Sequence, residues 1–254
     1  MPIRGLMLLR ASLLTVGVSL AVLPTSALAG YVTADGQVRQ CVVKKTGIVR
    51  ALTTKKRTCA KGETLLVLGA AGGVGLAAVE LGVAFGARVI GAVSSEEKAA
   101  AVRAAGASDV VVYDRGPFDK DASRALAESF KAAVGKGGAD VVYDAVGGDY
   151  CEPALRSIAW EGRYLVVGFP AGIPRLPLNL TLLKSCDVCG VFWGAFAARA
   201  SQKNADHVAR LFRLWAEGRI APKVTANYPL ERGGDAIAHL ASRRAIGKVV
   251  VTLD

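Results

Sequence analysis

The sequence predicts an α/β fold, a doubly wound parallel sheet preceded by a small β-hairpin module. Three observations support this. Residues 64–68 form an unbroken apolar run, typical of a strand buried on both faces. A glycine-rich turn follows, and residues 73–85 then place apolar side chains at helical spacing. From residue 88 onward, strand-like and helix-like segments alternate, which indicates parallel strands joined by helical crossovers.

The turn after the first strand reads G-A-A-G-G-V-G over residues 69–75. Glycine is needed there because a side chain would keep the backbone away from a pyrophosphate and the helix away from its strand. The N–H groups at the start of the helix attract an anion. A purely structural turn is the alternative. The strand before the turn, and the helix and second strand after it, favour a Rossmann dinucleotide-binding site.

The remaining elements are expected at regular intervals. Strands are expected at residues 88–93, 110–113, 140–144 and 164–168, with helices at 95–105, 123–134 and 150–158. A helix pair at 204–217 and 234–242 precedes a terminal strand at 248–253. We therefore expect a signal peptide (1–29), a basic hairpin segment (30–62), a Rossmann domain (63–221), and a closing helix and strand (222–254).

The first 29 residues have the three parts of a secretory signal. Arg4 and Arg10 give a positive start, residues 11–23 are apolar, and residues 27–29 read Ala-Leu-Ala. The apolar run is short for a membrane span, and the alternative is a leader that stays attached. We expect a periplasmic or secreted protein without a stable membrane span after signal removal.

The next segment predicts a β-hairpin. Residues 37–43 and 48–52 are β-prone, with Lys45-Thr46-Gly47 between them. Cys41 and Cys59 either pair after export or remain as two thiols. Residues 1–62 hold ten lysines and arginines against one acid, so most of the net charge of +11 resides there. With the single aromatic Tyr31 and no groove-reading helix, this segment does not predict a nucleic-acid partner.

From residue 62 to 254 the chain resembles the nucleotide-binding half of the medium-chain dehydrogenase/reductase superfamily, closest to its NADPH:quinone oxidoreductase branch. The matching text is G-E-T-L-L-V-L-G-A-A-G-G-V-G, then A-F-G-A-R-V-I-G, D-V-V-Y-D-A-V-G-G and I-G-K-V-V-V. That superfamily has a large barrel-like lobe before this domain, whereas about sixty unrelated residues precede it here. Those residues resemble a short cysteine-bearing hairpin of exported bacterial proteins, so the sequence indicates a fusion. The dehydrogenase part taken alone implies a cytoplasmic protein, in contrast to the signal peptide.

Cofactor choice is usually decided at the end of the second strand. Ser94, nineteen residues beyond Gly75, stands where an acid would bind the ribose hydroxyls of NAD. Serine can donate to a 2′-phosphate, although residues 94–97 also read as a capping box, which would explain both serines. The resemblance implies that Lys98, Tyr113 and Arg243 hold that phosphate. The expected cofactor is NADPH.

The resemblance also implies the rest of the cofactor-binding residues, which follow the ends of the predicted strands. Those residues are Gly69, Ala71, Gly72, Gly73, Val74, Gly75, Val146, Gly168, Phe169, Pro170, Phe192 and Trp193. Phe192 and Trp193 contact the cofactor ring or, alternatively, pack in the core or in a dimer seam. The superfamily commonly joins two such domains at the sixth strand, so a homodimer through residues 188–192 is expected.

We assign no catalytic residue and no metal site. Cys186 and Cys189 form a lone C-x-x-C on a predicted strand, where their side chains would diverge. Asp144 ends a strand and is either functional or a cap of the following turn. Neither point excludes hydride transfer, because the cofactor carries the reactive group.

Three functions remain open. The first is reduction of a quinone or enone by NADPH. The second is a truncated nucleotide-binding module without turnover, and the third is an exported hairpin protein that carries an inactive Rossmann domain. The closing segment would pack in part against the missing lobe, so we expect the apolar side chains of residues 224–229 to lose their partner sheet. The chain alone is then expected to bind NADPH and to turn quinone over slowly.

Overall fold

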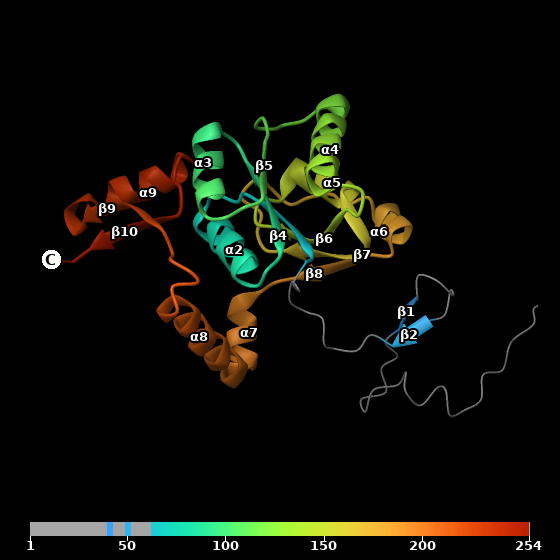
Figure 1. Cartoon of the computed structure of the whole chain (residues 1–254). Helices are drawn as coiled ribbons and strands as arrows, with labels where there is room; N and C mark the ends of the chain where they lie inside the picture. Colours follow the sequence, from blue (N-terminus) through green and yellow to red (C-terminus); the bar gives the residue numbers. More distant parts are fainter. Residues whose placement is uncertain (1–39, 43–48, 52–61, 254) are drawn as a thin grey trace, which may run out of the picture. The chain divides into compact units, whose positions relative to one another are not determined.

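The computed structural model describes residues 40–42, 49–51 and 62–253, with side chains from residue 62 (Figure 1). The chain divides into two units, Met1–Arg57 and Thr58–Asp254, and each is described by itself. The expected signal peptide, the turn at Lys45-Thr46-Gly47 and the side chains of Cys41 and Cys59 lie outside the described residues.

The first unit contains the predicted hairpin. Strands β1 (Gln40–Val42) and β2 (Val49–Ala51) pair antiparallel, with Cys41 opposite Arg50.

The second unit is built on one parallel sheet of six strands in the order β5-β4-β3-β6-β7-β8. This order confirms the doubly wound fold, and the chain reverses direction across the sheet between β3 and β6. The strands are β3 (Thr64–Leu68), β4 (Arg88–Val93), β5 (Asp109–Val112), β6 (Ala139–Asp144), β7 (Ile158–Val166) and β8 (Asp187–Gly190).

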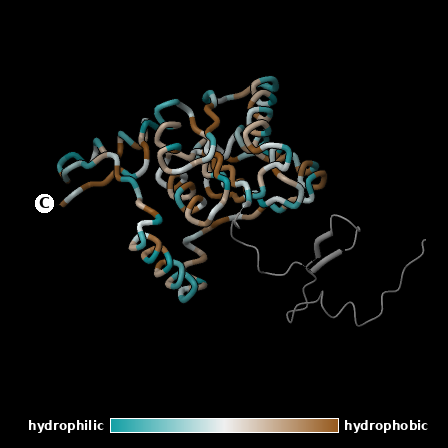
Figure 2. The backbone as a smooth tube through the Cα atoms, in the orientation of Figure 1, coloured by the Kyte–Doolittle hydropathy of each residue, from teal (hydrophilic) through white to brown (hydrophobic). Residues whose placement is uncertain are grey.

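Helices cover both faces of this sheet (Figure 1). One core lies beneath α2 (Gly73–Ala84) and α3 (Glu96–Ala104). The other lies beneath α4 (Lys120–Val134), α5 (Cys151–Arg156) and α6 (Leu178–Lys184). Figure 2 shows the hydrophobic colour concentrated in the strands between these two layers.

Strand β3 divides its side chains between the two cores. Leu66 and Leu68 join the α4–α5 side, whereas Leu65 and Val67 join the α2–α3 side. This follows from the alternation of side chains along a strand, and it explains why the sequence shows a continuous apolar run.

Helix α3 lies directly against β4. A Cβ atom on Gly91 would stand 2.4 Å from Cγ1 of Val102, closer than real carbon atoms approach. The glycine in the middle of β4 therefore sets how closely this helix packs.

One predicted boundary was wrong. A helix was expected over residues 150–158 and a strand from 164, but α5 ends at Arg156 and β7 already begins at Ile158. The Ser157 hydroxyl donates to the Ala154 carbonyl at the end of the helix, and Ile158 pairs with Ala139. The β6–β7 register then shifts, and Glu161 takes a φ of 58°, a local irregularity without a sequence signature.

Most side chains of residues 224–229 are exposed, as expected for a segment that has lost its partner sheet, and the strand pairs with another part of the closing segment. After α7 (Trp193–Arg199) and α8 (Ser201–Ala216), strand β9 (Val224–Pro229) pairs in parallel with β10 (Lys248–Thr252). The short helix η2 (Leu230–Arg232) and α9 (Gly233–Ala241) connect them. These strands form a separate two-stranded sheet, which lies beside the main sheet in Figure 1.

Among the described residues, no helix combines the length and the apolar character that a membrane span requires.

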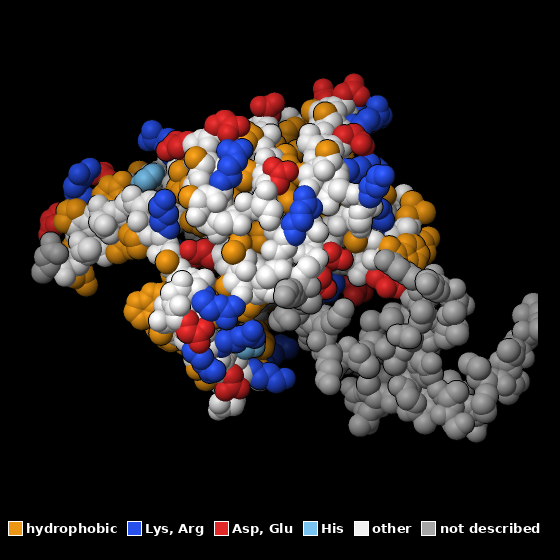
Figure 3. Space-filling model, in the orientation of Figure 1, with side chains coloured by type: hydrophobic (Ala, Val, Ile, Leu, Met, Phe, Trp, Pro, Cys, Tyr) orange, Lys and Arg blue, Asp and Glu red, His pale blue; other side chains and the backbone are white. Residues whose placement is uncertain are grey.

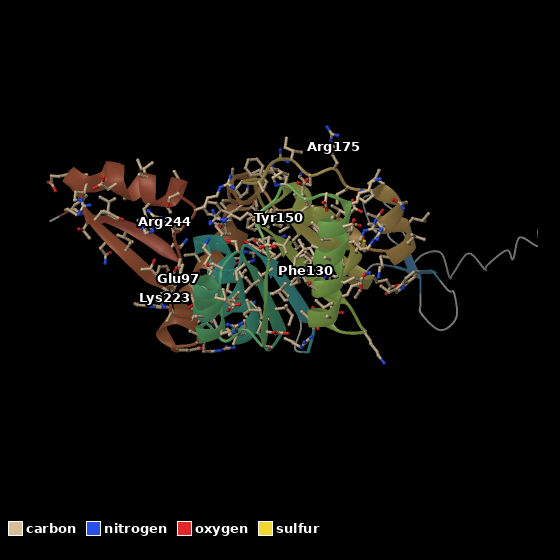
Figure 4. All side chains as sticks on the ribbon, turned by 90° about the horizontal axis from the view of Figure 1, so that it is seen from above. Glu97, Phe130, Tyr150, Arg175, Lys223 and Arg244 are labelled. Atoms are coloured by element: carbon tan, nitrogen blue, oxygen red, sulfur yellow. The ribbon has the colours of Figure 1, made fainter. Side chains whose placement is uncertain are left out.

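Phe130 tests the core beneath α4. Its ring is fully buried between α4 and the sheet (Figure 4), so Phe130→Ala should lower the free energy of unfolding by about 3–5 kcal/mol because it leaves a cavity. Phe212→Ala, the same change at an exposed position of α8, should cost much less. Urea titrations of both variants measure the difference, and equal losses would contradict the assignment of this core.

Candidate nucleotide-binding site

The glycine turn after β3 leads into α2 at the carboxyl end of the sheet. Gly69 has a φ of 66°, and the Gly72 N–H donates to the Gly69 carbonyl over 3.0 Å. A Cβ atom on Gly75 would lie 2.2 Å from that carbonyl oxygen, so only glycine permits this approach of turn and helix. The structure therefore brings the predicted turn together in the form that the sequence indicated.

The first turn of α2 is free to receive an anion. Gly72 caps the helix without a side-chain hydrogen bond, and the first turn contains no acidic residue. The backbone N–H groups at a helix start carry partial positive charge and need partners. Val74, in the same turn, has an exposed side chain. The arrangement suits a pyrophosphate.

At the end of β4, the two serines have different roles. Ser95 is the N-cap of α3, and its hydroxyl accepts a hydrogen bond from the Lys98 backbone N–H over 3.3 Å. Ser94 does not cap the helix. Its Oγ lies 3.4 Å from Nζ of Lys98. The capping alternative therefore explains Ser95 but not Ser94, whose hydroxyl lies beside the Lys98 ammonium group.

Lys98 is held by the closing segment of the chain. Its ammonium donates to the backbone carbonyl of Arg243 over 2.7 Å. Burial lowers the pKa of Lys98, the positive charge of Arg115 lowers it further, and Glu97 works in the opposite direction. Lys98, Ser94 and Arg243 thus meet, with Arg115 as an additional positive charge nearby.

Arg243 spans two parts of the site. Its φ of 58° is a conformation that L-residues seldom adopt, and its guanidinium donates to the Pro170 carbonyl over 3.2 Å. The residue therefore contacts α3 through its backbone and the segment after β7 through its side chain. In this arrangement the guanidinium bonds Pro170, although the resemblance implied a phosphate contact.

Tyr113 contacts Tyr150. The ring centroids are 4.9 Å apart, and Tyr150 belongs to the core on the α4–α5 face of the sheet. Burial raises the pKa of Tyr113, whereas a hydrogen bond with the Gly69 backbone works against the shift. The hydroxyl thus supports the glycine turn. Within residues 62–253, no hydrogen bond links it to Lys98.

Asp144 caps the turn that follows β6. Its carboxylate is 2% exposed and accepts hydrogen bonds from the backbone N–H groups of Val146 and Gly147, each over 2.8 Å. The Tyr164 hydroxyl donates to the other oxygen over 2.7 Å. Of the two alternatives for Asp144, the structure therefore shows the cap. Sequence reasoning missed Tyr164, because its contact crosses from β7 to β6.

The cap positions the predicted residues at the ends of β6 and β7. Val146 lies against the glycine turn, since a Cβ on Gly69 would be 2.8 Å from its methyl group. The Gly168 N–H donates to the Asp144 carbonyl over 3.3 Å. This bond places Gly168, Phe169 and Pro170 beside the turn that follows β6. The Phe169 side chain is exposed.

Phe192 and Trp193 do not pack with the other residues that were expected to bind the cofactor. They follow β8 and are 78% and 67% exposed, so the alternative of core packing was wrong. The Trp193 indole N–H donates to Asn204 at the start of α8, over 3.1 Å.

Metal-binding and acid–base groups were sought in the same region. Within residues 62–253, no group of three or more histidine, cysteine or acidic side chains is placed to hold a metal. Burial raises the pKa of the Cys151 thiol to about 12, which makes it unreactive at neutral pH. Cys186 is half-buried before β8, and Cys189 is exposed on it.

The site fits a dinucleotide on structural grounds. A side chain would fill the glycine cradle, the helix start lacks an acid, and a cluster of cations lies at the end of β4. This is the expected position for the phosphate groups at the switch point of a doubly wound sheet.

Comparison with known proteins extends this result. Residues 73–210 match the family model described as zinc-binding dehydrogenase. The chain belongs to this family. It is 38% identical over 200 residues to the quinone oxidoreductase-like protein 2 of Bos taurus, covering 78% of this chain and 55% of that protein. An acryloyl-coenzyme A reductase of Metallosphaera sedula is 33% identical over 195 residues, covering 76% of this chain and 51% of that protein.

Solved structures of the same family resemble the fold. The Escherichia coli quinone oxidoreductase in complex with NADPH gives a TM-score of 0.68 at 29% identity, covering 79% of this chain and 60% of that one. A mycobacterial protein in complex with NADPH gives 0.70 at 29% identity, with the same coverage. These matches confirm the resemblance to the nucleotide-binding half of quinone oxidoreductase-like proteins. The chain spans about half the length of the curated relatives that it matches.

Gly75→Ala tests the glycine turn. The added methyl group meets the Gly69 backbone, so the free energy of unfolding should fall by about 1–3 kcal/mol and nucleotide binding should be lost. Gly233→Ala, at the first position of α9 with nothing within 4 Å, should leave both unchanged. Urea titration and nucleotide titration of the two variants provide the comparison. A Gly75→Ala protein that binds like the parent would contradict the role of the close contact.

Proposed function

We propose that the chain is an NADPH-binding oxidoreductase of the quinone oxidoreductase type, which transfers hydride from NADPH to a quinone or enone. The observation that carries the proposal is the grouping of Ser94, Lys98 and Arg243 at the end of β4, where Ser94 takes the place of an acid that would repel a 2′-phosphate. The NADPH complexes of two structural relatives support the choice of cofactor.

Each part of the site has a separate task in this proposal. NADPH, when bound, supplies the hydride. The N–H groups of residues 73–75 hold the pyrophosphate, while Lys98 and Ser94 bind the 2′-phosphate with the added charge of Arg115. Val146 and Gly168 lie at the ends of β6 and β7 beside this site, and hydrogen bonds to Asp144 hold both in place.

Lys98 provides the sharpest test of the cofactor. Removing a charge-assisted hydrogen bond costs about 1–3 kcal/mol, so Lys98→Ala should weaken NADPH binding by roughly 5- to 150-fold. NADH, which lacks the 2′-phosphate, should lose much less. Lys136→Ala removes an exposed lysine in the turn after α4 and serves as the matched control. Calorimetric titration with both nucleotides measures the effect, and equal parent affinity for NADPH and NADH would refute the proposal.

Turnover is a separate question, because the chain spans about half of its relatives. Val74 and Phe169, two of the residues expected to bind the cofactor, have exposed side chains. Water exclusion and orientation supply much of the rate of such reactions. These observations favour a module that binds NADPH and reacts slowly.

We therefore expect NADPH oxidation by simple quinones at well under about one turnover per second, below the ordinary range of enzymes. The measurement is steady-state NADPH absorbance with the purified full chain. An NADPH affinity measured on the same sample is the control, since it separates slow chemistry from absent binding. Rates on the order of 1–1,000 per second would show that the described half suffices for catalysis.

We also propose that two copies associate through β8. This strand is the last of the six-stranded sheet, its residues are exposed, and Val191 and Phe192 extend the apolar edge beyond it. An apolar, unpaired edge is a template for pairing with a second chain.

Val191→Lys places a charge at that edge and should yield a smaller particle than the parent in light scattering. Val224→Lys is the matched control, because Val224 is 47% exposed on β9 and Val191 is 43% exposed. A parent protein that is monomeric at high concentration would end the proposal.

A further inference from the structure

A groove between α2 and α8 lies away from the glycine turn and has no role in the proposed function. Its volume is about 510 Å³, within the range of small-molecule sites. From α2 it is lined by Ala77, Glu80 and Leu81, which share one face of the helix. We name it the α2–α8 groove.

The facing wall is the apolar stripe of α8. Val208, Leu211, Phe212 and Trp215 follow helical spacing, and all four side chains are exposed. Leu214 is the only residue of α8 that is buried within the described part of the chain. Figure 3 shows hydrophobic side chains on the surface at this end of the molecule. An apolar stripe of this kind normally packs against a hydrophobic core. On α8 the stripe is exposed instead.

Two arginine contacts join α8 and the segment after it to the end of α2. The guanidinium of Arg210 lies 4.7 Å from the ring centroid of Phe85, at the end of α2. The guanidinium of Arg219, which follows α8, donates to the Ala84 carbonyl.

Glu80 is the only charged side chain among the described residues that line this apolar groove. Burial raises the pKa of its carboxyl group, and a hydrogen bond from the Ala221 backbone partly offsets the shift. Lys223 and Lys248 line a small neighbouring pocket that shares Glu80, but within residues 62–253 neither makes an ion pair with it. A partly buried carboxylate without a cationic partner favours a ligand that brings one.

We propose that the α2–α8 groove binds a lipophilic amine, a small molecule with an apolar body and one ammonium head group. The apolar body packs between Leu81 and the stripe of α8, against Phe212 and Trp215. The ammonium group donates to the carboxylate of Glu80. Charge complementarity selects this occupant over a fatty acid, whose carboxylate would face Glu80 with the same sign.

The test uses decylammonium, decanol and decanoate as probes that share one carbon chain and differ in the head group. Each is titrated into the full chain below its self-association concentration, and tryptophan emission is followed. Decylammonium should bind saturably and most tightly, and decanoate most weakly. In Trp215→Phe the emission change should disappear, which assigns the signal to the groove.

Two variants test whether binding depends on the charge of Glu80 or only on non-specific apolar contact. Glu80→Gln keeps the shape of the side chain and should weaken decylammonium by about 10-fold while leaving decanol within about 2-fold. Glu231→Gln removes an exposed acid elsewhere and should change neither.

Several results would overturn the proposal. They are equal binding of decylammonium and decanoate, equal losses in Glu80→Gln and Glu231→Gln, or the absence of saturable binding. A dimer that dissociates when decylammonium is added, observed by sedimentation, would show that a second copy covers the groove. NADPH affinity should be the same in Glu80→Gln and the parent, so failure here is distinguishable from failure of the proposed function.

Discussion

The close contact between Gly69 and Gly75 is the constraint on which the rest of the site depends. A methyl group at Gly75 would overlap the Gly69 carbonyl, and the same turn receives contacts from the neighbouring strands. The Ala70 N–H donates to the Ala92 carbonyl of β4, and Val146, in the turn after β6, packs against Gly69. The closing segment contacts the turn as well. Gly247 forms a β-bridge with Gly72, and its N–H donates to the Ala71 carbonyl. The turn is therefore where four separate stretches of the chain meet, and its backbone sets their relative positions.

Electrostatics at the end of β4 are set by distant parts of the sequence. Lys98 is fixed by a carbonyl 145 residues further along, and that residue, Arg243, reaches across to Pro170 with its side chain. The hydrogen bond to a neutral carbonyl gives the Lys98 ammonium group an acceptor without neutralising its charge. The cluster thus keeps net positive charge, which favours an anionic ligand and disfavours an acid at Ser94.

The sequence predicted those parts of the molecule that have local signatures. Strand β4 was found with its observed bounds, because the apolar run is flanked by charge and serine. The glycine turn and Ser94 were found from spacing, and Lys98 was implied by the family resemblance. The start of β7 was missed, since the bulge at Glu161 depends on pairing with β6. Tyr164 and Arg115 were missed for the same reason, as their partners are remote in sequence or become neighbours only in the folded chain. The pairing of β9 with β10 was also missed, because an isolated strand carries no information about its partner.

The contact of Gly91 with Val102 has a consequence for how this protein can change over evolutionary time. The two positions share one fixed volume between β4 and α3, and the smallest addition at Gly91 already overlaps the valine. A larger residue at 91 is therefore tolerated only with a smaller one at 102. In related sequences these two positions should vary as a pair, although eleven residues separate them, and the compensating double substitution should be more stable than the single change at 91.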